Sequence, residues 1–261
     1  MQLTDGLLLA GAALGAGLLN AIAGGGSFLT FPALVFAGLP PIAANATSAV
    51  AVSPGYFGSV LGFRDELARL PRARLRREAL ICAVGGVAGA LLLLVTPAQV
   101  FSAVVPWLLL FATVLFALGP RLLAVRQRRA AATAGPTPPA DAPSAARTLG
   151  LLAVAIYGGY FGAGAAFMIM AGHAITGIAD VRKSVALKNL VVTVMTTVSV
   201  AVFVAAGAIA WRETVAMMAG ALPGGYWGAR LAQRIDPAKL RLAILAIAVA
   251  LTAYYFWKVY A

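Results

Sequence analysis

The chain has few of the residues on which most catalytic and metal sites depend. Only 11% of its 261 residues are charged, and it contains one cysteine and one histidine. A lone thiol excludes a disulfide framework and a cysteine metal cluster, and a lone imidazole excludes a multi-histidine metal site. The sequence also lacks Walker, GxSxG, HExxH and paired-carboxylate patterns. We therefore expect no catalytic residue, no metal and no cofactor, and we do not expect an enzyme.

Acidic residues are scarce as well. There are eight, and the sequence places all of them in loops or at the ends of apolar runs. Because cation carriers and proton pumps usually keep a carboxylate inside the membrane, cation substrates are disfavoured. The 20 Lys and Arg residues give a net charge of +12, but most of them lie in short segments between apolar runs. Such charges face lipid headgroups, so the expected partner is the lipid bilayer and no nucleic acid is expected.

Apolar sequence is what the chain has in excess. Hydrophobic residues make up 62% of it, and apolar runs of about 18 residues or more recur. This composition predicts an all-α polytopic membrane protein. The predicted apolar segments are residues 7–22, 27–38, 43–63, 79–95, 99–119, 148–163, 166–178, 184–210, 215–229 and 241–257.

The two halves of the chain look alike. The stretch GLLNAIAGGGSFLTF has a later counterpart in GGYFGAGAAFMIM, and ANATSAVAV is echoed by SVALKNLVV. Between the halves, residues 121–147 are rich in Ala, Pro and Arg, which is typical of a flexible linker. We therefore predict a first transmembrane repeat at 1–120, a cytoplasmic linker at 121–147 and a second transmembrane repeat at 148–261.

The distribution of basic residues favours one orientation of the repeats. If each half crosses the membrane five times, residues 64–78, 121–147, 180–183 and 230–241 share one side and hold 17 of the 20 Lys and Arg residues. If each half crosses four times, with the short segment re-entrant, the repeats are parallel and only 13 lie inside. The positive-inside rule favours inverted repeats with both termini outside.

A run of glycines interrupts the first predicted span. Gly24, Gly25 and Gly26 penalise a continuous helix, so we predict a half-helix that starts at about Ser27 near the middle of the membrane. Its free N–H groups and positive dipole end favour an anion, and Asn20 in the preceding turn is placed to donate its amide to a bound oxyanion. The alternative is that the glycines allow close helix packing.

Polar and glycine positions elsewhere extend this candidate substrate site. Gly162 and Gly164 form the matching break of the second half, and there an anion site and close packing are equal alternatives. Asn45, Thr47 and Ser48 head the next span of the first half. They either cap a helix or, because they lie opposite a second-half lysine in the repeat scheme, contribute to substrate binding.

That lysine is Lys188, which lies with Asn189 inside the apolar run 184–210. A cation in hydrocarbon costs about 2.5–3.5 kcal/mol, so it persists mainly where it faces a cavity, a partner or a substrate. We therefore expect Lys188 and Asn189 to meet an anion; the alternative is a lysine that snorkels to the membrane surface. The single histidine, His173, either couples transport to protons or lies at the membrane interface.

The stretch GLLNAIAGGGSFLTFPALVFAGLPPIAANATSAVAV resembles the TauE/SafE family of sulfite and organosulfonate exporters. The resemblance covers essentially both halves and includes ADVRKSVALKN, although Ala165 and Ala166 replace glycines expected in the second motif. It implies a multi-pass carrier for small anions, typically sulfur-containing ones, in the bacterial inner membrane.

These observations predict a secondary transporter for a small anion, and the resemblance implies an exporter of sulfite or of an organosulfonate such as sulfoacetate. It would work by alternating access at the interface between the repeats. A carrier of another small organic anion and a passive anion channel are the alternatives. The sequence leaves proton coupling and a homodimer open.

Overall fold

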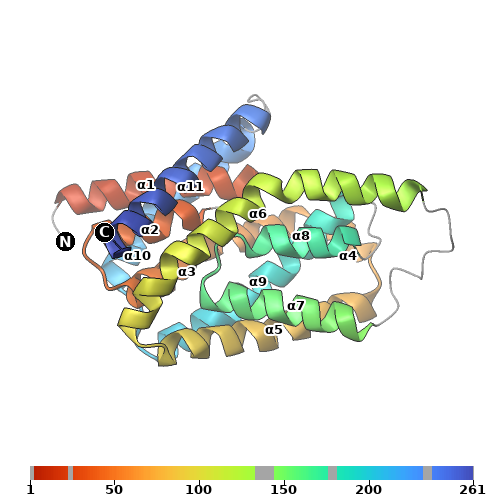
Figure 1. Ribbon diagram of the computed structural model, residues 1–261, viewed down its shortest axis with the longest axis horizontal. Helices are drawn as coiled ribbons and strands as arrows, with labels where there is room; N and C mark the ends of the chain where they lie inside the picture. The colour runs from red at the N-terminus through yellow and green to blue at the C-terminus, as the bar shows by residue number, and fades with distance from the viewer. Residues whose placement is uncertain (1–2, 23–25, 133–143, 176–180, 232–236, 261) are drawn as a thin grey trace.

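The computed structural model describes residues 3–22, 26–132, 144–175, 181–231 and 237–260, and every regular element in these ranges is an α-helix (Figure 1). Each predicted apolar segment is a helix, and α4 is an additional short one. The helices are α1 (Leu3–Ile22), α2 (Ser27–Phe36), α3 (Pro41–Gly62), α4 (Arg64–Ala68), α5 (Arg72–Val95), α6 (Ala98–Ala132), α7 (Ala145–Tyr160), α8 (Ala165–Ile175), α9 (Val181–Ala205), α10 (Trp211–Leu231) and α11 (Pro237–Tyr260).

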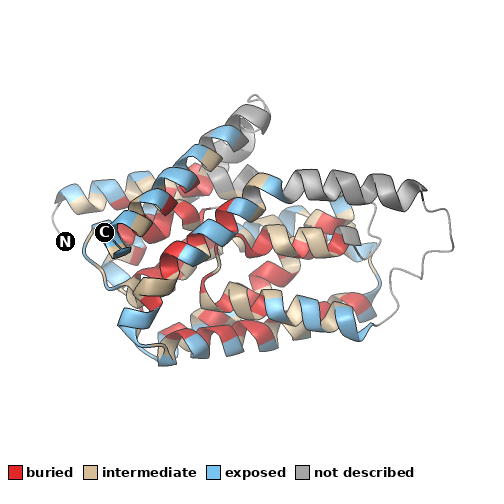
Figure 2. Cartoon of the chain, in the orientation of Figure 1, coloured by how far each residue is buried: buried red, intermediate tan, exposed pale blue. Residues whose placement is uncertain are grey.

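Three stretches in the described ranges are long and apolar enough to cross a membrane by length and composition. They are Arg72–Val95, Ala98–Leu115 and Arg182–Ala205. Large apolar side chains point outward from several helices, among them Leu80, Val84, Trp107, Phe111 and Val249, while the buried residues gather between the helices (Figure 2). An outer surface of this kind is the one that a protein presents to lipid. The predicted all-α fold is therefore confirmed for the described residues, and the long apolar helices are consistent with a membrane protein.

The first predicted span is broken where the glycines occur. Helix α1 ends at Ile22 and α2 begins at Ser27, so a single helix does not run from residue 7 to residue 38. At about 1.5 Å per residue, the ten residues of α2 rise only about 15 Å, half the thickness of a bilayer core. The predicted half-helix and its start at Ser27 are confirmed, while Gly24 and Gly25 lie outside the described residues.

The matching break of the second half lies between α7 and α8. Gly162 and Gly164 have φ angles of +81° and +82°, a backbone conformation that costs side-chain-bearing residues energy. Two glycines at this spacing let the chain leave α7 and start α8 within a few residues. The second break is therefore a defined turn.

Small residues bring the two halves into close contact along two helix pairs. On α10, Gly220 and Gly224 pack against the backbone of α1, and on α5, Gly85 and Gly89 pack against α7. A Cβ at any of these four positions would collide with an atom of the facing helix. Close packing through small residues is thus the role of these glycines. Each half packs its first helix against a helix of the other half.

The two halves also lead the chain in opposite directions. The start of α1 and the end of α11 lie at one end of the long axis, and the end of α6 and the start of α7 lie at the other (Figure 1). Helix α6 continues to Ala132, within the range predicted as linker, because its last turns, RLLAVRQRRAAA, are rich in Ala, Leu and Arg, which favour helix.

Candidate functional site

Helices α2 and α8, which follow the two glycine breaks, both begin at one small cavity, called here the central cavity. Ser27, the first residue of α2, lines it from one half, and Ala165 and Ala166, the first residues of α8, line it from the other. Residues of α3, α9 and the end of α7 complete the wall. The cavity volume is about 30 Å³, room for one or two water molecules. The structure therefore has a small cavity where the two breaks face each other.

Asn20 and Gly26 hold the start of α2. The Gly26 N–H donates to Asn20 Oδ1 at 2.8 Å, and the Gly26 carbonyl accepts from the amides of Leu29 and Thr30 at 3.0 and 3.1 Å. The amides of Ser27 and Phe28 have no acceptor within the helix, as is general for a first helical turn. They form the positive end of α2 at the cavity. Asn20 thus anchors this helix start through its carbonyl oxygen, a role that the sequence did not predict.

Gly26 has a steric reason to be glycine. A Cβ at this position would lie 2.6 Å from Asn20 Nδ2 and 2.9 Å from the Ala16 carbonyl oxygen. A larger residue would therefore separate Asn20 from the start of α2. Of the three glycines in the first break, this is the one within the described residues.

The polar residues at the head of α3 divide into two groups. Asn45 and Ser48 are buried and line the cavity. Asn45 Nδ2 donates to the Tyr160 carbonyl at 2.9 Å, at the end of α7, and the Ser48 and Thr30 hydroxyls lie 2.6 Å apart. Thr47 does not line the cavity, because its Oγ1 accepts from the Ala210 amide at 3.0 Å, just before α10. Thr47 therefore secures α10, while Asn45 and Ser48 stay in the candidate site.

The start of α8 is held by the turn that precedes it. Tyr157 Oη donates to the Ala163 carbonyl at 2.8 Å, and the Gly164 carbonyl accepts from the Phe167 amide at 3.0 Å. Gly162 lines the cavity, whereas a Cβ at Gly164 would lie 3.1 Å from the Ala112 side chain. Gly162 therefore belongs to the site, and Gly164 shapes the turn against α6.

Lys188 and Asn189 lie close to the cavity without lining it. Lys188 is partly buried on α9, one turn before Val192, which does line the cavity. No hydrogen bond or ion pair joins the Lys188 side chain to another described residue. Asn189 is buried beside it, and the Asn189 backbone carbonyl accepts from Thr193 Oγ1 at 2.7 Å. The role of Lys188 at the anion site stays a prediction.

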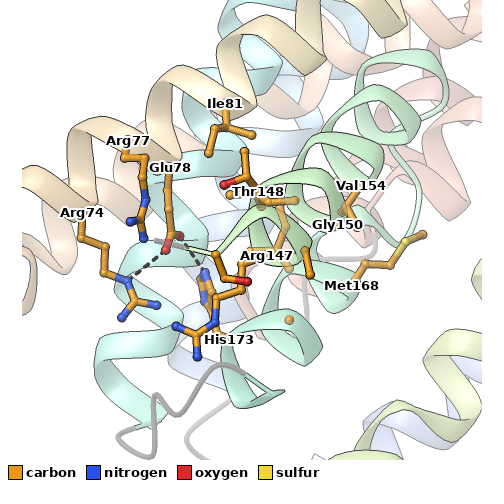
Figure 3. Close-up of a pocket in the computed structure, with 15 residues that line it drawn as sticks. Arg74, Arg77, Glu78, Ile81, Arg147, Thr148, Gly150, Val154, Met168 and His173 are labelled. Carbon is orange, nitrogen blue, oxygen red and sulfur yellow. Dashed lines mark hydrogen bonds and ion pairs between the residues drawn. The ribbon is translucent and has the colours of Figure 1, made fainter. Parts of the chain in front are cut away.

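A buried ionic cluster lies at the end of the molecule where α5 begins. Glu78 Oε1 accepts from Arg74 Nε at 2.9 Å, and Glu78 Oε2 lies 3.1 Å from His173 Nε2 (Figure 3). His173 Nδ1 in turn lies 3.3 Å from Ser184 Oγ. All four residues are at most 6% exposed. The cluster joins α5 of the first half to α8 and α9 of the second.

The expectation that no carboxylate lies within a span is wrong for Glu78. It is buried in the second turn of α5, where its charge is matched by Arg74 and by the imidazole of His173. A buried carboxylate is tolerated where partners of this kind compensate its desolvation. The i, i+4 spacing of Arg74 and Glu78 was the available sequence signal, but nothing local pointed to His173 on another helix.

Comparisons with known proteins extend over almost the whole chain. The protein-family model described as "Sulfite exporter TauE/SafE" matches residues 9–255. "Probable membrane transporter protein ORF9" of Sinorhizobium sp is 31% identical over 242 residues, 90% of this chain and 87% of that protein. "Probable membrane transporter protein YfcA" of Escherichia coli (strain K12) is 28% identical over 241 residues, 91% and 84% of the two chains. No solved structure matches.

Proposed function

This chain belongs to the TauE/SafE family of membrane transporters, and we propose that it carries a small anion across the bacterial inner membrane by alternating access. The substrate is sulfite or an organosulfonate such as sulfoacetate, moved outward. The family description supports the sulfur oxyanion and the direction.

One observation carries the proposal: the first turns of α2 and α8 open onto the same cavity from opposite halves. Helix α2 contributes the amides of Ser27 and Phe28, which have no acceptor within the helix. Helix α8 contributes the amide of Ala166, since the Ala165 amide already donates to the Gly162 carbonyl at 3.3 Å. Each helix also contributes the positive end of its dipole. Asn45 adds a side-chain amide and Ser48 a hydroxyl, both able to donate to an oxyanion. Broken helices that meet near the membrane midplane are how many secondary carriers hold their substrate.

The proposal includes inverted repeats. The opposite directions of the two halves and the matching order of their helices support it. So does the concentration of 17 of the 20 Lys and Arg residues in segments that would share the cytoplasmic side. Cysteines placed at the exposed positions Ala68 and Ala146 should then react only with reagent supplied inside, and those at Ala98 and Ala206 only with reagent supplied outside. Reaction of Ala206→Cys from the inside would overturn the inverted arrangement.

A flux measurement tests the transport function itself. Purified protein in vesicles should move labelled sulfite or sulfoacetate faster than labelled acetate. Exchange of internal against external anion that is faster than net flux identifies a carrier. Unsaturable flux that simply follows the membrane potential identifies an anion channel instead, and absence of flux for all three anions contradicts the proposal.

A further inference from the structure

A second, larger cavity lies between α5, α7 and α8 at the end of the molecule that holds the Glu78 cluster. Its volume is about 250 Å³, against about 30 Å³ for the central cavity, and no described residue lines both. It fits a small organic molecule. Helices α7 and α8 contribute residues to both cavities. On α7, Val154 lines the larger cavity, and Gly158, one turn later, lines the central one.

One side of this cavity carries positive charge. Arg74 and Arg77 come from α5 and Arg147 from α7, and among the described residues that line the cavity the one carboxylate is that of Glu78 (Figure 3). Glu78 is held by Arg74 and His173, so the carboxylate has partners within the protein. The three arginines make further contacts within the protein, and each guanidinium has five N–H donors in a planar fork that suits an oxyanion. The charge at this end of the cavity therefore favours an anion.

The opposite side is apolar. Ile81 from α5, Leu151 and Val154 from α7, and Met168 and Ile169 from α8 form it, and in Figure 3 Val154 and Met168 lie away from the guanidinium groups. An inorganic oxyanion would contact the charged end and leave this wall uncovered. A ligand with a hydrocarbon body would cover it and gain from the removal of apolar surface from water.

We propose that this cavity is a binding site for small organic monoanions, with the charged group against Arg77 and Arg147 and the apolar body against Leu151 and Val154. The inference rests on the proposed transport function for its biological meaning. There the cavity is a peripheral substrate site, next to the central one along α7 and α8. It selects sulfonates or carboxylates with a hydrocarbon part over sulfite.

Protection of an introduced thiol reports occupancy of this cavity directly. Gly150 lines the cavity and is exposed, and a Cβ added there meets no atom within 4 Å. Gly150→Cys in a Cys82→Ala background should react with a maleimide, and hexanesulfonate should slow this reaction. From propanesulfonate to hexanesulfonate, the concentration for half protection should fall about fourfold per methylene. Sulfite should protect poorly.

Two changes in the cavity and two outside it make the test specific. Arg147→Gln should raise the half-protection concentration about tenfold, the loss of one charged hydrogen bond, and Leu151→Gln should flatten the chain-length dependence. Gly58→Cys, which is exposed, has similar open space and lines neither cavity, should not be protected. Ser48→Ala, in the central cavity, should leave protection of Gly150→Cys unchanged.

Equal protection by methanesulfonate and hexanesulfonate, or equal protection of Gly150→Cys and Gly58→Cys, would overturn the inference. Protection by dihexanoyl phosphatidylglycerol without protection by hexanesulfonate would assign the cavity to a lipid headgroup and overturn it too. Failure of sulfite flux with intact chain-length-dependent protection would count against the proposed central site alone.

Discussion

Near their starts, α5 and α10 carry the same dipeptide at the same distance from a pair of glycines. Arg77-Glu78 precedes Gly85 and Gly89, and Arg212-Glu213 precedes Gly220 and Gly224. In both places the glycines pack closely against the first helix of the other half. The acidic residues differ: Glu78 is buried with Arg74 and His173, whereas no hydrogen bond or ion pair joins the Glu213 side chain to another described residue.

This comparison distinguishes the glycine contacts, which both helix pairs have, from the buried ionic cluster of Glu78, which α5 has and α10 lacks among the described residues. The glycine pairs occur twice because the same helix contact occurs twice. Among the described residues the buried ionic cluster occurs once: α8 ends near His173, whereas α2, its counterpart, has no ionisable residue between Ser27 and Phe36. Because the α1–α10 contact forms without a comparable cluster, the cluster is an addition at the end that holds the larger cavity.

The largest effect on folding should come from substitutions in the glycine contacts that α5–α7 and α1–α10 share. Gly89→Leu and Gly224→Leu would each drive a side chain into the backbone of the facing helix. Overpacking costs about 1–3 kcal/mol even where side chains can adjust, and backbone adjusts less. We expect both variants to lose the folded, monodisperse peak in size-exclusion chromatography. Gly11→Leu, at an exposed helix position with open space, is the matched control. A folded Gly224→Leu beside an unfolded Gly89→Leu would break the equivalence of the two contacts.

The second-largest effect should be a loss of stability that is much greater for substitution of Glu78 on α5 than for substitution of Glu213 on α10. Glu78→Ala leaves Arg74 buried without its carboxylate, which costs about 3–5 kcal/mol for a buried pair. Glu213→Ala should change stability by no more than about 0.5 kcal/mol, the usual range for a surface substitution. Thermal unfolding of the purified variants in detergent measures both. Equal destabilisation would mean that Glu213 has a role that its surroundings do not reveal.

The smallest effect should concern binding. Lys188→Met keeps the length and apolarity of the side chain and removes its charge, so affinity for the transported anion should weaken by about 1.5–3 kcal/mol. Ser48→Ala, from the first half, removes a neutral hydroxyl and should weaken it by about 0.5–1.5 kcal/mol. Isothermal titration calorimetry with sulfite compares them. Unchanged affinity in Lys188→Met would mean that Lys188 snorkels to the membrane surface and does not contact the anion. The binding site would then consist of residues of α2, α3 and α8.

Much of the helical framework could be predicted because its signals are local. Apolar length predicted the ten main helices, and the glycine run predicted the break before Ser27. The partner of Thr47, the Ala210 amide, was not predictable, because the two residues are 163 positions apart. The same holds for Glu78 and His173, which are 95 positions apart and meet only when α5 packs near α8. Local patterns predict elements, whereas polar partners on different helices depend on the assembled fold.

Helix α6 shows a similar limit of local reasoning. The Ala, Pro, Thr and Ser content of residues 121–147 and their basic start suggested a flexible linker, yet the alanines and arginines up to Ala132 are good helix formers when they continue an existing helix. Composition alone does not distinguish these outcomes.

The pairing of α1 with α10 and of α5 with α7 has a consequence for how the protein is made. Helix α1 leaves the ribosome first, but the glycine face that it packs against belongs to residues 211–231. At about 5–20 residues per second, roughly 10–40 s of translation separate the two. During that interval α1 lacks its main neighbour, so the insertion machinery or lipid must cover its packing face. A messenger truncated after the first half would yield a membrane-inserted but unfinished protein, a natural substrate for membrane proteases.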